Sequence, residues 1–81
     1  MPEPQFRWES HGRQVQTAVS PDGDVANVFP PMVPWRTDAW TWSAAGIEYG
    51  ASRDGAAPTE RAAKHAAEEA LLDLWRARRR R

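Results

Sequence analysis

The sequence predicts an α+β domain, in which an antiparallel sheet of four to five strands packs against one long C-terminal helix. Apolar residues recur at a period near 3.6 over the last third of the chain, and they alternate with polar residues over most of the part before it. Two independent cores in 81 residues would each have roughly 40 residues, a size that usually needs cross-links. We therefore expect a single domain over residues 1–81.

The predicted sheet region covers residues 6–52 and follows a flexible N-terminus at residues 1–5. Turn residues at His11–Arg13 and Ser20–Gly23 divide its first half, and the Ser-Pro-Asp-Gly order is typical of a type I turn. Alternating apolar and polar side chains predict three strands around these turns, at Phe6–Ser10, Val15–Val19 and Val25–Phe29.

A proline-rich loop is predicted at residues 30–38, because prolines 30, 31 and 34 cannot lie in a central strand or a helix interior. After this loop, Ala39–Ser43 and Ile47–Ala51 flank the small residues Ala44–Gly46 and predict a second hairpin. Residues 53–57 then link the sheet to the helix.

The helix is the clearest predicted element and spans residues 59–78, with a basic tail at 79–81. Thr59 is the expected N-cap, and Glu60 follows it where the helix dipole favours an acid. A broad apolar stripe is expected to face the sheet, and the indoles of Trp40 and Trp42 are expected to pack against it. The residues of this stripe are Ala62, Ala63, Ala66, Ala67, Ala70, Leu71, Leu74 and Ala77.

The charges balance overall but divide unevenly along the chain. Eleven basic and eleven acidic residues give a formal net charge of zero, so whole-molecule electrostatics give no reason to expect nucleic acid or an acidic membrane as a partner. Residues 1–59 hold seven acids and four bases, whereas residues 60–81 hold four acids and seven bases. The two parts either complement each other within the fold, or the basic part is a tail for a partner.

The chain has no cysteine, so we expect neither disulfides nor thiolate metal sites, and a cytoplasmic setting. No long apolar stretch or signal peptide is recognisable, so no membrane association is expected.

No combination of residues predicts an enzyme, a cofactor or a metal. His11 and His65 lie on different predicted elements, and neither has the spacing of a zinc site. Asp22 and Asp24 echo the start of a calcium loop, but no glutamate follows at the closing position. The glycine-rich phosphate-binding sequences are absent.

Five arginines near the C-terminus allow two interpretations. They could neutralise the phosphates of a nucleic acid, or they could form a hydrated helix end whose cations interact favourably with the dipole. These residues are Arg76, Arg78, Arg79, Arg80 and Arg81.

Leu72 and Trp75 are predicted on the side of the helix opposite the stripe, beside Arg76 and Arg79. A leucine and a tryptophan rimmed by arginine have the composition of an interface centre, for a partner protein or for a second copy of the chain. Burial under the proline-rich loop and chance exposure are the alternatives. Trp35 and Arg36, next to that loop, are a second predicted contact.

Residues 39–81 resemble the compact accessory proteins of phages and prophages in high-GC bacteria. The resemblance rests on the Trp-x-Trp strand at 40–42, a short hairpin, a Gly-Ala loop with its Thr59 cap, and an alanine-rich helix running into terminal arginines. Such proteins include anti-CRISPR inhibitors of host defence, so the resemblance implies a non-enzymatic blocker of a larger nuclease or effector complex.

We therefore expect a non-enzymatic, cytoplasmic binding protein that docks on a protein or nucleoprotein complex and blocks it. The alternatives are nucleic-acid binding through the C-terminal arginines and formation of a homodimer.

Overall fold

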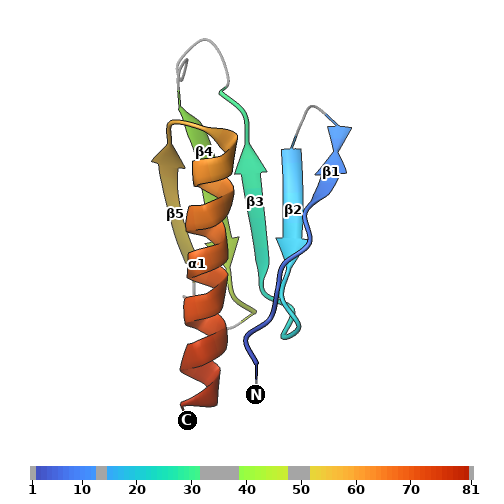
Figure 1. Cartoon of the computed structure of the whole chain (residues 1–81), viewed down its shortest axis with the longest axis vertical. Helices are drawn as coiled ribbons and strands as arrows, with labels where there is room; N and C mark the ends of the chain where they lie inside the picture. The colour runs from blue at the N-terminus through green and yellow to red at the C-terminus, as the bar shows by residue number, and fades with distance from the viewer. Residues whose placement is uncertain (1, 13–14, 32–38, 48–51, 81) are drawn as a thin grey trace.

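The computed structural model describes residues 2–12, 15–31, 39–47 and 52–80. Within these residues the chain forms a five-stranded antiparallel sheet followed by one helix, so the predicted α+β class is confirmed (Figure 1). Strand order in the sheet equals order along the chain. The strands are β1 (Glu9–His11), β2 (Val15–Val19), β3 (Val25–Phe29), β4 (Trp40–Ala45) and β5 (Ser52–Ala57), and the helix is α1 (Glu60–Arg79).

The structure confirms the predicted bounds of β2 and β3 but shifts the first strand. β1 begins only at Glu9, and the segment before it forms no regular element. Phe6 and Trp8, which the alternation placed in a strand, instead pack against the core as partly buried side chains. Burial of these two rings, rather than pairing of their backbone with β2, therefore accounts for their apolar spacing.

The second hairpin also differs from the prediction. β5 occupies the stretch predicted as a linker, whereas Ile47, predicted to begin a strand, lies in a bend and is 68% exposed. The rest of that predicted strand lies outside the described residues. In the observed register Trp40 pairs with Ala57 and Trp42 with Gly55, so each indole has a small residue beside it. This pairing leaves room for the two rings, which explains why residues 52–57 form the strand although the residues before them have a higher strand propensity.

Helix α1 begins and ends close to the predicted residues 59–78. Thr59 is extended, and its side-chain oxygen accepts a hydrogen bond of 3.1 Å from the Ala62 N–H, as expected of an N-cap. At the other end the Arg80 N–H bonds to the carbonyls of Arg76 and Ala77.

The core lies between α1 and one face of the sheet. Ala18, Ala26 and Ala44 lie side by side on adjacent strands and are buried, as are Ala63 and Ala67 of the helix. Methyl groups on both surfaces let the helix approach the sheet closely. Leu71 and Val28 are the largest fully buried apolar side chains. Trp40 and Trp42 pack against this core, which confirms their predicted position.

Gly55 has no room for a side chain. A Cβ atom built on it would lie 2.9 Å from Nε1 of Trp42 and 3.0 Å from two of its ring carbons. We expect Gly55→Ala to lower the free energy of unfolding by about 1–3 kcal/mol, because the half-buried indole must move out of the core. Gly12→Ala is the matched control, since nothing lies within 4 Å of its Cβ position. Equal urea midpoints for the two variants would contradict this explanation.

Candidate functional site

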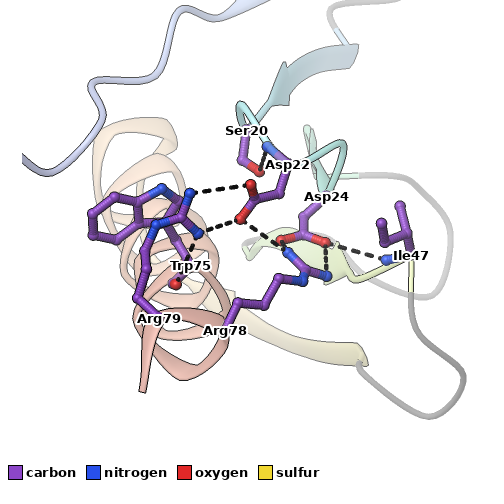
Figure 2. Close-up of polar contacts among 7 residues, drawn as sticks. All are labelled: Ser20, Asp22, Asp24, Ile47, Trp75, Arg78 and Arg79. Atoms are coloured by element: carbon purple, nitrogen blue, oxygen red, sulfur yellow. Dashed lines mark hydrogen bonds and ion pairs between the residues drawn. The ribbon is translucent and has the colours of Figure 1, made fainter. Parts of the chain in front are cut away.

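The C-terminal arginines meet the β2–β3 turn. Asp24, at the end of this turn, is fully buried, and it accepts hydrogen bonds from both terminal nitrogens of Arg78. The bond between Nη2 and Oδ1 is 2.7 Å long. Oδ1 also accepts the backbone N–H of Ile47 at 3.1 Å. The Asp24 carboxylate therefore connects the turn with the end of α1 and with the segment after β4 (Figure 2).

The turn is preorganised to present its carboxylates. Gly23 has φ 97°, a value that glycine adopts readily, and its N–H bonds to the carbonyl of Ser20 at 2.9 Å. The Ser20 hydroxyl accepts the Asp22 N–H at 3.2 Å. The Ser20 N–H bonds to the carbonyl of Asp24 at 2.8 Å and closes the turn. The Ser-Pro-Asp-Gly sequence thus directs both Asp22 and Asp24 toward the helix.

Asp22 extends the cluster to the surface. Nη1 of Arg79 lies 2.7 Å from Oδ2 of Asp22, and Nη1 of Arg78 lies 3.3 Å from the same oxygen. These guanidinium groups lower the pKa of Asp22, mainly through the hydrogen bonds of Arg79. The hydrogen bonds of Arg78 likewise lower the pKa of Asp24, against the rise that burial alone would cause. Both aspartates are therefore charged at neutral pH.

Trp75 is buried next to this cluster, so its prediction as an outward anchor is wrong. Its side chain is 6% exposed. The guanidinium of Arg79 lies 4.2 Å from the ring centroid, and Nη1 of Arg79 also donates to the Trp75 carbonyl at 3.3 Å (Figure 2). The buried side of α1 is thus turned toward Leu71 and Trp75, away from Ala62 and Ala77. The many alanines widened the predicted apolar stripe, but alanine is a strong helix former with a small apolar surface, so its positions do not determine which side of the helix is buried.

The arginines predicted to contact a partner are engaged within the chain. Arg78 is only 18% exposed, and Arg79 has the contacts just described. Arg76 pairs with Glu3 and with Asp73. These three arginines of the basic part of the chain are therefore paired with acidic residues of the acidic part. Arg80 is exposed, and Arg81 lies outside the described residues.

The other predicted contacts divide into two groups. Leu72 is partly buried on α1, and because Trp75 is buried the two side chains do not form an outward patch. The homodimer interface predicted from that patch therefore lacks the exposed indole on which it was based. Trp35 and Arg36 lie outside the described residues.

The sheet face opposite α1 is a surface that the sequence did not single out. It carries the odd-numbered residues of β2, β3 and β4 and the even-numbered residues of β5. Val19 on this face is 56% exposed, and Ala45 and Ala56 are also exposed. Thr17 donates a hydrogen bond of 2.7 Å to Asn27 across the strands. We call this surface the open face. Its strand alternation was visible in the sequence, but the side facing the helix was predicted only for the strand that carries Trp40 and Trp42.

The open face is hollowed at its β1 side. The hollow lies between the N-terminal segment and β2, and its lining includes Arg7, Glu9 and His11 together with Gln5, Thr17 and Val19. His65, the other histidine, is exposed on α1.

Within the described ranges, no three His, Asp or Glu side chains gather closely enough to hold a metal ion. Asp22 and Asp24, whose spacing echoed a calcium loop, bind Arg78 and Arg79 instead. No helix in the part of the chain that the structure describes is long and apolar enough to cross a membrane. Comparison with family models, with curated proteins and with solved structures found no match to this chain.

Proposed function

We propose that this chain is a non-enzymatic binding protein that docks on a protein or nucleoprotein partner through the open face of its sheet. The observation that carries the proposal is the exposure of apolar side chains on this face, Val19 above all. The helix covers only the other face (Figure 1). An apolar side chain among neutral polar groups such as Thr17 and Asn27 has the composition of a non-obligate protein interface.

The paired arginines favour a protein surface over a phosphate backbone as the main contact. Arg76, Arg78 and Arg79 already bind carboxylates of the same chain, so a nucleic acid would have to displace these contacts before its phosphates could be neutralised. Nucleic-acid binding through the arginines remains the alternative function.

Blocking of a host defence complex, in a cytoplasmic setting, is the more specific form of the proposal. Support for it comes from the resemblance of residues 39–81 to phage accessory proteins and from the absence of cysteine. A steric blocker needs only a docking surface, so the proposal does not require a catalytic group.

Affinity capture from the native host tests the docking surface. We expect Val19→Glu to abolish capture of a partner that wild type retains, because it places an unpaired charge at the most exposed apolar position of the open face. His65→Glu is the matched control, since it puts the same charge on the exposed side of α1. Equal capture by both variants would exclude the open face.

Salt dependence distinguishes the alternative function. Retention through the open face should change little between low and high salt, whereas binding to phosphates falls steeply. A steep fall, together with loss of the captured material on nuclease treatment, would support the nucleic-acid alternative instead.

A further inference from the structure

The N-terminal segment, residues 2–8, takes no part in the contacts described for Arg78 and Arg79, and its Gln5 and Arg7 line the hollow at the edge of the open face. It forms no helix or strand, and it lies alongside α1 (Figure 1). Two polar contacts attach it to the helix. The indole N–H of Trp8 donates to the Glu68 carboxylate at 2.7 Å, and Nε of Arg76 donates to the carboxylate of Glu3.

These two attachments lie on one row of the helix surface. Glu68, Leu72 and Arg76 are four residues apart in turn, so their side chains line up on one face. Glu68 and Arg76 are separated by about 12 Å along the axis at 1.5 Å per residue. The segment from Glu3 to Trp8 can span at most about 17 Å when extended. The segment is therefore long enough to follow this row from one attachment to the other, and Leu72, which lies between them on the row, is partly buried.

The contacts that hold the segment are weak compared with those of the core beneath it. Glu3 and Arg76 are each close to half exposed, and ion pairs in such positions contribute little to stability. The Lys64 ammonium adds a contact at 5.8 Å from the ring centroid of Trp8. Phe6 and Trp8 pack against the core, but both are only partly buried. Leu71, by contrast, is fully buried. A segment without a backbone ladder and with few buried contacts opens at lower free energy than the core.

We infer that residues 2–8 are a displaceable strap, which detaches from α1 while the sheet and helix remain folded. Its detachment exposes a helix ridge on which Leu72 lies between the carboxylate of Glu68 and the guanidinium of Arg76. While it is attached, the strap covers this ridge, so any molecule that contacts the ridge must first displace the strap. The inference does not rest on the proposed function, because it is argued from the contacts of the segment with α1 and not from the exposure of Val19 on the other face of the sheet.

The absence of cysteine allows a direct test, because one introduced thiol is then the sole site of labelling. Leu72→Cys places the thiol under the strap. His65→Cys gives the rate for an exposed helix position, and Leu71→Cys gives the rate for the core. Ala67→Cys is a second buried position if Leu71→Cys does not fold. Circular dichroism establishes that each variant is folded before iodoacetamide is added to the full-length chain.

We expect Leu72→Cys to react more slowly than His65→Cys and faster than Leu71→Cys. Adding Glu3→Ala should speed the reaction at Leu72→Cys about two- to five-fold, as expected for loss of a surface ion pair, and leave the other two rates unchanged. A Leu72→Cys rate equal to that of the core position would show that the strap opens only on global unfolding. A rate equal to that of His65→Cys, or no response to Glu3→Ala, would show that the strap does not cover Leu72. Any of these results overturns the inference.

Discussion

Replacing Trp75 by alanine should destabilise the fold by about 3–5 kcal/mol, the range typical of a buried tryptophan replaced by alanine. The indole is enclosed, and the Arg79 guanidinium stacks on its ring. A chain of this length has an expected total stability of about 4–12 kcal/mol. The variant should therefore unfold at a much lower urea concentration than wild type, and its melting temperature should fall by more than about 10 °C.

Two controls distinguish lost packing from a lost anchor. Leu72→Ala removes a partly buried side chain from the same turn of α1 and should cost less, whereas His65→Ala at an exposed position should stay within about 0.5 kcal/mol of wild type. If Trp75→Ala melted like wild type, the indole would not belong to the core. Trp75 would then again be a candidate for contact with a partner.

The error over Trp75 shows which parts of this fold local chemistry specifies. The N-cap of α1 and the strands β2 and β3 were predicted because alternation, turn residues and a threonine before an acidic first turn all act within a few residues of one another. The side of the helix that faces the sheet was predicted incorrectly, because alanines at 62, 66 and 77 were counted as apolar although their side chains have little surface to bury. Weighting each position by its side-chain area would have turned the stripe toward Leu71 and Trp75.

β5 was missed for a related reason. Its sequence, Ser-Arg-Asp-Gly-Ala-Ala, has low strand propensity, and its identity as a strand depends on pairing with β4. The register shows why residue 55 is a glycine: it lies opposite Trp42, and the indole leaves no room for a side chain there. Tertiary fit to the two indoles therefore overrides local propensity at this edge of the sheet.

The charge cluster depends on contacts between residues far apart in the sequence. Asp24 and Arg78 are 54 positions apart, and the sequence offered several acids as partners for each arginine. The uneven division of charge indicated that the two parts of the chain could complement each other. It did not indicate which pair would be buried, because that choice depends on where the helix end meets the β2–β3 turn.

Arg78→Met should lower the free energy of unfolding by about 3 kcal/mol at neutral pH, because it leaves the fully buried carboxylate of Asp24 without its cation. The methionine retains much of the volume of the arginine stem, so the loss is mainly electrostatic. Arg79→Met is the matched control. Its partner Asp22 is more exposed, and water can solvate the carboxylate that remains, so its effect should be smaller. Urea unfolding at pH 7 compares the two.

The pH dependence identifies the carboxylate responsible. In the wild type the pKa of Asp24 lies below its ordinary value, so the stability that this group contributes is present above about pH 4 and is lost as the pH falls through the lowered pKa. In Arg78→Met, burial without a cation should raise the pKa of Asp24 above its ordinary value. The variant should then recover stability as the pH falls from 7 toward 4, so the difference from wild type should narrow.

A second substitution tests the same cause without a change of pH. Asp24→Asn in the Arg78→Met background removes the buried charge but retains an oxygen that can accept the Ile47 N–H. The double variant should therefore be more stable than Arg78→Met alone at pH 7, and its difference from wild type should no longer narrow on acidification. If Asn at position 24 restores nothing, or if the deficit of Arg78→Met is the same at pH 4 and pH 7, the stability comes from packing of the arginine stem rather than from the ion pair.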